Sequence, residues 1–544
     1  MTIQTGWKAV MCALAAVTLA APMAGASPQD MEELSSSRDH DSAAVQRVAR
    51  SEERTLTALL ASRDTTAGLS ASRREVRIPF TLAPGAQASG AELVLTARPR
   101  SSASGGRLEA FIAGGRTITL APQAQPFEAR FALYSESLSE GDNLLVIRFD
   151  AGEADGWEID LRASRLRVTA LPAAGHETLG SLEAALAAHF AAPRRVYIDA
   201  AGAGRDRLAV EALAAQGLAL RMGEVPVLVS RPEAAELVVR AGIDPLSSGA
   251  SIALADPYTV RLAGADATTV TAAARLFAAR SLADTGSRMT PTNALSAPRL
   301  TRTGGQDGAR GDGLQALARA GAPFAREQGG RAAIVLAGEN GDDRLGGLTL
   351  VARAALASGS AWLYAWYGSD LASVPPAHDL LVLGPMAELD NNLMRAAPAE
   401  LRAAAQAASR RVPRERRSYG STAFAAEGSA MTGAVTGIGG LYRDDQGRTV
   451  AVLTAPEGAD FSRAARRLAR SSDLWTSLHG SAVLWDAGTL TAFGPTARDH
   501  APLGARLVEM FRAHDRLLAG IAFGIAVLLL LAGSAVNRRS TARA

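Results

Sequence analysis

One loop of the chain has the residue types that could cradle a phosphate. After the predicted strand "RRVYIDA", Gly202 and Gly204 begin a pattern close to G-x-G-x-x-G, but Arg207 occupies its third position. Glycine at that position lets the helix pack closely on the strand, and an arginine side chain prevents this. We therefore predict an ordinary strand-to-helix turn and no dinucleotide site.

Two further loops at strand ends carry carboxylates. The loop "GENGDDRLGG" contains Asp342 and Asp343, at a position where a glycosyltransferase would hold a divalent ion and a sugar nucleotide. The loop "APEGAD" contains Glu457 and Asp460. Carboxylates at a helix N-terminus cap the helix and repel a phosphate. These loops favour solvated turns, and an enzyme acting through Asp342 and Asp343 is the alternative hypothesis.

The sequence lacks the residues or motifs that the other common catalytic mechanisms require. Cys12 and Lys8 are the only cysteine and lysine, and both stand in the first 26 residues. The histidines show no metal-ligand spacing, and no G-x-S-x-G elbow occurs. We predict no catalytic residue, no metal site and no cofactor. The formal net charge is +3 without a basic block, so nucleic acid is not an expected partner.

Both ends of the chain have membrane-targeting features. Residues 1–26 have the pattern of a secretory signal peptide ending at "AGA", with an N-terminal anchor as the alternative. Residues 517–536 form an uncharged apolar run long enough to cross a bilayer, followed by an arginine-bearing tail at 537–544 that we expect in the cytoplasm. We therefore predict a single-pass protein of the inner membrane with its bulk in the periplasm.

The segment 503–516 is predicted to be an amphipathic helix. Its apolar side chains form one stripe, so the helix either lies in the membrane interface or packs on the last domain. The residues expected to anchor the chain in the membrane or against a partner are Leu503, Leu507, Met510, Phe511, Leu517, Phe523 and Leu528.

Between the two ends, the hydrophobic pattern predicts a multidomain α+β fold. A polar leader at 27–70 precedes short alternating runs at 71–172, typical of an antiparallel β-sandwich of jelly-roll size. Strands then alternate with helices, which predicts flavodoxin-like α/β domains at 175–285 and 330–500, separated by a linker at 286–329. "TVRLAGADATTVTAAARLFAAR" and "TVAVLTAPEGADFSRAARRLAR" are near-copies with Asp266 and Asp460 at the expected helix caps, which indicates a duplicated domain.

Aromatic residues are the remaining candidates for binding, because sugars stack on aromatic rings. Trp157, Tyr134 and Phe111 lie in the sandwich region, where they either contact a glucan or fill the core. In "WLYAWY", strand alternation would place Trp362, Tyr364 and Trp366 on one face, again as core or as part of a sugar path.

The order of these segments resembles the periplasmic B subunit of bacterial cellulose synthase. "EARFALYSESLSEGDNLLVIRF" is similar to a sandwich segment of that family, and "GRTVAVLTAPEGADFSRAARRLARSSDLWTSLHGSAVLWD" is similar to its last α/β domain. The resemblance covers about residues 70–540. Unlike the family, the chain has no room at 281–329 for a second sandwich, which puts in doubt a full-length glucan path and the identity of the polymer.

The resemblance implies a non-catalytic subunit with a carbohydrate-binding-like sandwich. Its partners would be the membrane-embedded catalytic subunit, the nascent glucan and the inner membrane. The family is often labelled as binding cyclic di-GMP, a ligand that we assign to the catalytic partner because no arginine-rich cytoplasmic motif on a folded domain occurs here. The alternative is a sugar-binding accessory protein of another envelope polysaccharide system.

Overall fold

The structure is a computed structural model that describes residues 48–60, 64–100, 107–120, 125–150, 156–302, 313–338, 340–422, 435–457 and 459–494. The predicted signal peptide, the helix at 503–516, the span at 517–536 and the tail lie outside these ranges. So do all the predicted anchoring residues, which are Leu503, Leu507, Met510, Phe511, Leu517, Phe523 and Leu528. Within the described ranges, no helix combines the length and the hydropathy that crossing a membrane requires.

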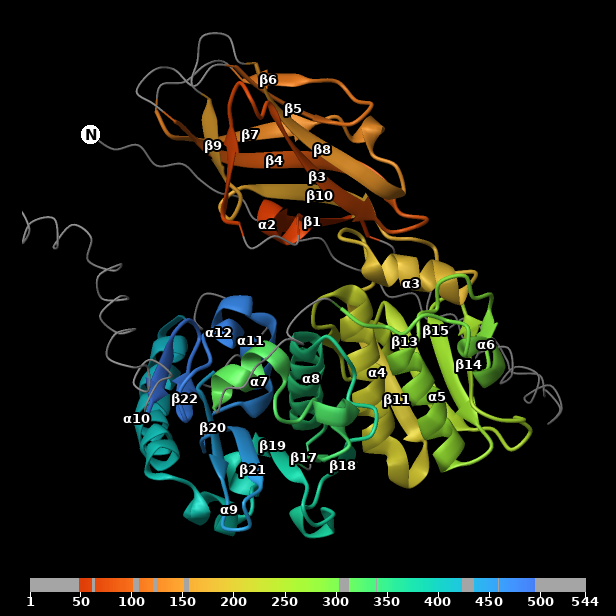
Figure 1. Ribbon diagram of the computed structural model, residues 1–544, viewed down its shortest axis with the longest axis vertical. Coiled ribbons are helices and arrows are strands. Elements are labelled where there is room, and N and C mark those ends of the chain that lie inside the picture. Colours follow the sequence, from red (N-terminus) through yellow and green to blue (C-terminus); the bar gives the residue numbers. More distant parts are fainter. Residues whose placement is uncertain are drawn as a thin grey trace, which may run out of the picture. The chain divides into compact units, whose positions relative to one another are not determined.

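Ten strands of the described chain form two antiparallel sheets (Figure 1). Alternation places every second side chain between the sheets, as in β3, where Val76, Ile78 and Phe80 are buried. One sheet has the order β1-β10-β4-β9-β2, with β7 also on β4, and the other has the order β3-β8-β5-β6. The bounds are β1 (Arg50–Thr55), β2 (Thr66–Leu69), β3 (Glu75–Leu82), β4 (Gln87–Pro99), β5 (Arg107–Ile112), β6 (Ile118–Leu120), β7 (Phe127–Leu133), β8 (Gly141–Asp150), β9 (Trp157–Asp160) and β10 (Arg165–Leu171).

The prediction of a polar leader up to residue 70 is wrong in its second half. β1 pairs with β10, β2 pairs with β9, and the short helix α2 (Leu56–Leu59) lies between them. Leu56 and Leu69 are fully buried. The charged sequence "RSEERT" of β1 concealed the strand because its charged side chains form ion pairs with other elements, as described below.

The first α/β domain is built on a sheet of order β12-β11-β13-β15-β14-β16. Its first four strands are parallel, and β14 and β16 complete the sheet in antiparallel pairs. Helices α4 and α5 pack on this sheet. The bounds are α3 (Leu179–Ala187), β11 (Arg195–Gly202), α4 (Arg207–Met222), β12 (Val227–Leu228), β13 (Leu237–Ile243), β14 (Ser251–Asp256), β15 (Thr259–Gly264), α5 (Ala267–Ala279), β16 (Arg288–Met289) and α6 (Pro291–Ala294).

The second α/β domain has a sheet of order β18-β17-β19-β21-β20-β22-β23. Helices α8 and α11 pack on it with one core, and α10 packs on β20, β22 and β23 with a separate one. The bounds are α7 (Leu314–Ala320), β17 (Ala332–Leu336), α8 (Gly341–Ser358), β18 (Trp366–Gly368), β19 (Asp379–Pro385), α9 (Asn391–Ala396), α10 (Ala399–Thr422), β20 (Gly437–Arg443), β21 (Thr449–Ala455), α11 (Phe461–Arg470), α12 (Ser472–Thr476), β22 (Ala482–Trp485) and β23 (Leu490–Phe493).

The two α/β sheets share strand order and strand direction over six strands, which supports the predicted duplication. The helix after β15 and the helix after β21 are capped by Asp266 and Asp460, as the near-copies indicate. A flavodoxin-like order is wrong at the far edge of each sheet, however. β14 joins β15, and β20 joins β21, through turns too short for a parallel crossover, so one strand of each pair runs antiparallel.

The predicted linker at 286–329 is also wrong over most of its length. β16 and α6 complete the first α/β domain, and α7 packs on α8 in the second. Leu314, Leu317 and Phe324 are fully buried or nearly so. Only 303–312 lies outside the described residues, so the composition rich in Gly, Ser, Thr and Arg concealed structured segments on both sides.

The two α/β domains share one hydrophobic core, in which α4 and α8 lie side by side (Figure 1). Gln216 of α4 is fully buried at this seam. Its amide oxygen accepts a hydrogen bond from the Trp362 backbone N–H at 2.8 Å, and its amide nitrogen donates to the Tyr367 hydroxyl at 2.8 Å. Satisfied buried polar groups of this kind fix how α4 meets the segment that runs from Trp362 into β18.

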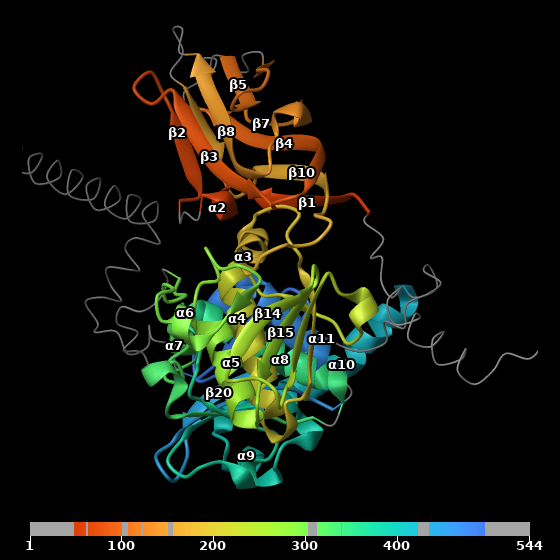
Figure 2. The ribbon, with the colours of Figure 1, turned by 90° about the vertical axis from the view of Figure 1, so that its right-hand side faces the viewer.

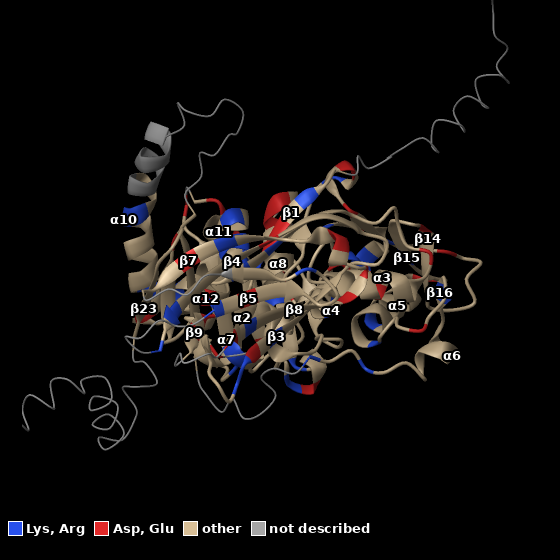
Figure 3. Cartoon of the chain, turned by 90° about the horizontal axis from the view of Figure 1, so that it is seen from above, with Lys and Arg blue, Asp and Glu red and all other residues tan. Residues whose placement is uncertain are grey.

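The sandwich joins the first α/β domain through the segment 188–194 and through β1. Phe190 packs edge-on against Phe80 with ring centroids 5.7 Å apart, and the backbone N–H groups of His189 and Phe190 both donate to the Thr81 carbonyl at 3.1 Å. Figure 3 shows basic and acidic residues together along β1.

A charged cluster closes the same junction. The guanidinium of Arg54 donates to both carboxylate oxygens of Glu224 at 2.5 and 3.0 Å, and Arg194 lies 2.8 Å from the same carboxylate. Burial raises the pKa of Glu224, but the hydrogen bond from Arg54 and the charge of Arg194 outweigh it, so the pKa lies below its usual 4.5. The carboxylate is therefore ionised and binds the two domains together at neutral pH.

Candidate functional site

The outer face of the sheet β3-β8-β5-β6 presents side chains that the core does not use. Alternation in the three longer strands directs one set of side chains inward and the other outward. Figure 2 shows these three strands side by side, and their pairing aligns the outward side chains in rows.

Three kinds of row follow from the register. Arg148 lies between Glu75 and Glu109, and its guanidinium lies 2.6 Å from the Glu109 carboxylate. In the next row Val146 lies between Arg77 and Phe111, and beyond it Pro79 pairs with Leu144. The face therefore runs from an ion-paired row, through a mixed row that includes Arg77, to the apolar pair of Pro79 and Leu144.

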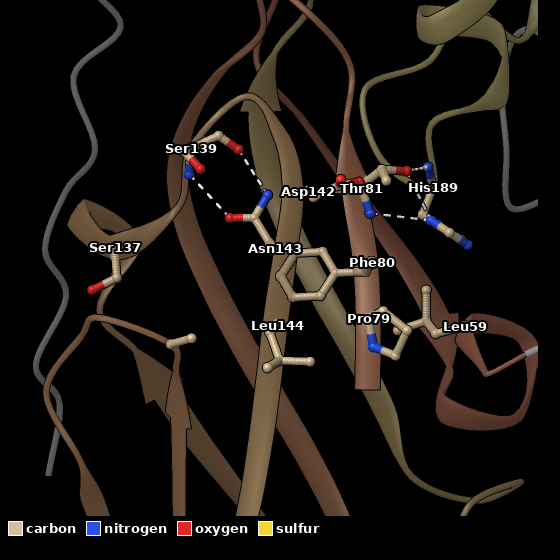
Figure 4. Close-up of a pocket in the computed structure, with 11 residues that line it drawn as sticks. Leu59, Pro79, Phe80, Thr81, Ser137, Ser139, Asp142, Asn143, Leu144 and His189 are labelled. Carbon is tan, nitrogen blue, oxygen red and sulfur yellow. Dashed lines mark hydrogen bonds between the residues drawn. The ribbon is translucent and has the colours of Figure 1, made fainter. Parts of the chain in front are cut away.

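The apolar pair of Pro79 and Leu144 lines a pocket of about 520 Å³ (Figure 4). Its apolar part is lined by Leu59, Pro79, Phe80, Ala113 and Leu144. Its polar groups come from Thr81, Ser137, Ser139, Asp142 and His189. Asn143 also lines the pocket, but its amide is occupied, because it accepts from the Ser139 N–H at 3.0 Å and donates to the Ser139 carbonyl at 2.7 Å.

His189 enters the pocket from the junction segment. Its Nδ1 accepts a hydrogen bond from the Thr81 backbone N–H at 3.1 Å and lies 2.9 Å from the Thr81 hydroxyl. Burial lowers the pKa of His189, and the charges of Arg54 and Arg194 lower it further. The ring is therefore neutral at pH 7, with Nδ1 as an acceptor and its proton on Nε2.

The three aromatic residues predicted to contact a glucan differ in their exposure to solvent. Trp157 cannot contact one, because it is 0% exposed and packs edge-on against Phe127 with ring centroids 5.3 Å apart. The alternation of β9 directs Trp157 and Ile159 into the core, so that part of the prediction is wrong.

Phe111 and Tyr134 lie at the surface. Phe111 is half-buried on the outer face, with the Arg148 guanidinium carbon 5.4 Å from its ring centre. Tyr134 is 41% exposed, lies under the guanidinium of Arg116 at 5.4 Å, and directly precedes the short turn that contains Ser137 of the pocket. These two rings remain candidates for stacking on a sugar.

The chemistry of this face suits the binding of a neutral saccharide better than it suits catalysis. Apolar side chains and aromatic rings can pack on the C–H faces of a sugar, and hydroxyl, carboxylate and imidazole groups can bind its hydroxyls. Sequence reasoning missed the pocket because His189 arrives from another domain. The outward apolar residues Pro79 and Leu144, by contrast, could have been identified, because they interrupt the polar face of alternating strands.

The α/β loops lack a phosphate cradle within the described residues. Arg207 forms an ion pair with Glu211 at 2.8 Å, and its side chain occupies the start of α4. Asp460 accepts from the Arg463 N–H at 3.0 Å as the cap of α11. These contacts explain why side chains stand where a dinucleotide-binding loop needs glycine or bare backbone N–H groups.

The acids of the alternative enzyme hypothesis lie in the first turn of α8. Asp342 lies 4.0 Å from Arg466. The pKa of Asp343 is raised by burial and then by the nearby carboxylates of Glu388 and Asp460. Among the described residues, no group of three or more His, Cys, Asp or Glu side chains is arranged to hold a metal ion.

Comparisons with known proteins give partial structural likenesses. No protein-family model and no curated protein matches the chain. Similar solved structures include CBM35 from Cellvibrio japonicus Abf62, with 17% identity and a TM-score of 0.14 over 18% of this chain and 70% of that one. They also include the CBM36-1 domain of a multidomain xylanase from the hindgut metagenome of Trinervitermes trinervoides, with 9% identity and a TM-score of 0.16 over 22% and 96%. A family 35 carbohydrate binding module from Clostridium thermocellum matches with 10% identity and a TM-score of 0.16 over 22% and 98%.

Proposed function

We propose that this protein is a non-catalytic, carbohydrate-binding accessory subunit of a membrane-embedded polysaccharide synthase of the cellulose type. The observation that carries the proposal is the outer face of β3-β8-β5-β6, where Phe111 and the apolar pair of Pro79 and Leu144 lead into a pocket of hydroxyl, carboxylate and imidazole groups. A glucan chain has the matching chemistry, because its rings alternate apolar C–H faces with hydroxyl edges.

The sequence supports the membrane part of this proposal. The apolar run at 517–536 follows the last described strand within a few tens of residues, so it would tether the second α/β domain close to the bilayer. In this account the α/β domains act as a scaffold: they hold the sandwich through Glu224 and through Phe190.

Purification of the full-length chain from detergent-solubilised native membranes tests the partner. We expect a multi-span glycosyltransferase to copurify with it, and we expect the complex to bind a β-glucan. A protein that brings no glycosyltransferase with it would contradict the synthase proposal. If that protein still binds sugar, the second candidate, an accessory protein of another envelope polysaccharide system, would be favoured.

The enzyme alternative has a separate test. In cells that depend on this protein for polymer production, Asp342→Ala combined with Asp343→Ala should leave polymer output unchanged, because neither carboxylate takes part in the proposed function. A loss of polymer with normal amounts of folded protein would favour an enzyme and overturn the non-catalytic proposal.

A further inference from the structure

We propose that the second α/β domain carries its own saccharide site, at the carboxyl end of its parallel strands. A pocket of about 710 Å³ opens there, between the residues that follow β17, β18 and β19. In the sheet, β18 and β19 lie on opposite sides of β17. The chain leaves β17 toward β18 on one side and leaves β19 toward β20 and β21 on the other, so the two connections diverge here, which is where open α/β sheets form a ligand crevice.

The floor of this pocket is apolar. Val335 of β17 and Val382 of β19 lie at its base, with Leu371 and Leu389 beside them. Val335, Val382 and Leu389 belong to the core under α10, so the floor is held by packing. These three side chains are 1%, 0% and 6% exposed, so they support the pocket from below, and a ligand would contact its polar rim and the partly exposed Leu371.

The rim is polar and mixed in chemistry. It contains the carboxylates of Asp370, Glu388 and Asp390, the amides of Asn391 and Asn392, the Ser369 hydroxyl and the Arg395 guanidinium, so that donors and acceptors face one cavity. Hydroxyl groups both donate and accept hydrogen bonds, and a rim with both kinds of partner suits a ligand with many of them.

Local hydrogen bonds hold several rim side chains in place before a ligand arrives. Asp370 accepts from the Ala372 N–H at 3.0 Å, and Asp390 accepts from the Asn392 N–H at 2.7 Å. Each carboxylate offers about four lone-pair positions, so these bonds leave acceptor capacity directed at a ligand. A preorganised rim loses less entropy on binding than a flexible one.

The charge of the rim selects among sugars. Asp370, Glu388 and Asp390 face only one guanidinium among the described lining residues, that of Arg395, so the pocket is net negative. The ligand class is therefore a saccharide without acidic groups, neutral or amino-bearing, and not a sugar phosphate or a uronate.

This site is independent of the sandwich face, and the test keeps them apart. Full-length protein carrying Phe111→Ala and Tyr134→Ala, which removes both surface rings of the sandwich, is titrated by calorimetry with cellotetraose, with the tetramer of glucosamine and with a tetramer of galacturonate. We expect the glucosamine tetramer to bind at least threefold more tightly than cellotetraose at low salt, and the difference to shrink in 0.5 M NaCl, about the concentration at which charges are strongly screened. The galacturonate tetramer should not bind.

A charge-neutralising variant locates the binding. Asp370→Asn, Glu388→Gln and Asp390→Asn together remove the negative charge, and the two asparagines preserve the local capping bonds because Asn also caps helices and turns. In this variant the preference for the glucosamine tetramer should disappear, and its affinity should fall at least tenfold. The control is Asp445→Asn, an exposed acid in the turn at the opposite end of the same sheet, which should change neither value.

Three outcomes would overturn the proposal. In the first, neither cellotetraose nor the glucosamine tetramer binds. In the second, the galacturonate tetramer binds as tightly as the other two. In the third, the variant with Asp370→Asn, Glu388→Gln and Asp390→Asn keeps the preference for the glucosamine tetramer. A failure of sugar binding at the sandwich alone would leave this site standing, because every titration here is made without the sandwich rings.

Discussion

Glu224 is predicted to hold the sandwich against the first α/β domain. It accepts three short contacts, two from Arg54 on β1 and one from Arg194. Glu224→Gln keeps the shape of the side chain but removes the charge that compensates two arginines. Removing one partner of a buried ion pair destabilises a protein by about 3–5 kcal/mol.

Partial exposure reduces this value. The Glu224 side chain is 34% exposed and Arg194 only 14%, so solvent compensates part of the loss, and we expect about 2–3 kcal/mol for opening the junction. A change of 1.36 kcal/mol is a factor of ten, so the opening equilibrium should rise about 30- to 150-fold.

Hydrogen exchange measured residue by residue reports this opening directly. The amides of His189 and Phe190 are protected by the Thr81 carbonyl across the junction, so their exchange should accelerate by the factor above. Amides of β8, and those of β3 before Thr81, should not change, because their partners lie inside the sandwich.

The matched control is Glu233→Gln, an exposed acid nine residues away in sequence that should leave exchange unchanged. Unchanged exchange at His189 and Phe190 in the Glu224 variant, or equal acceleration in the control, would refute the reasoning.

Three further predictions concern pH and packing. The pKa of Glu224 lies below 4.5, so its contribution is fully present above that pH and is lost as the pH falls through the folded-state pKa; the difference in calorimetric unfolding temperature between wild type and Glu224→Gln should shrink toward zero in acid. Trp475→Phe removes the bond from its indole N–H to the Ala318 carbonyl at 2.8 Å and should lower the free energy of unfolding in urea by about 1–3 kcal/mol. Gly346→Ala would place a Cβ 2.9 Å from a backbone atom of α11 and should destabilise by about 1–3 kcal/mol, whereas Gly341→Ala, which meets open space, should not.

Several elements could be predicted from sequence because their local pattern agrees with their final environment. The alternating runs at 71–172 predicted strands of the sandwich such as β3. Asp266 and Asp460 were predicted as helix caps because an acidic side chain before a helix binds its first N–H groups. The shared strand order of the two α/β sheets agrees with the duplication expected from the near-copies.

Other elements could not be predicted, because distant residues decide them. The charged strand β1 is stabilised by Glu224, which stands far away in sequence, and composition alone made it look like a leader. Trp362 is fully buried and precedes a strand that begins only at Trp366, whereas Tyr364 is 56% exposed, so the expected shared face of "WLYAWY" is wrong. Tertiary packing between the α/β domains outweighs local alternation there.

The candidate site shows the same division. Phe111 could be proposed from its residue type and lies on the outer face. Trp157 could not be separated from it, because the four residues of β9 are too few for their alternation to show which face is buried. The position of His189 in the pocket could not be predicted from sequence, since its place beside Thr81 depends on how the junction segment 188–194 joins the sandwich.

The most direct test of the central claim is a calorimetric titration of the full-length protein with cellohexaose. We predict saturable binding by the wild type, affinity at least tenfold weaker in Phe111→Ala combined with Tyr134→Ala, and no loss in Tyr364→Ala, which removes an exposed ring of the second α/β domain. Equal affinity in the double variant and the wild type would contradict the claim that the outer face of the sandwich binds the glucan. No binding by the wild type would contradict carbohydrate binding itself.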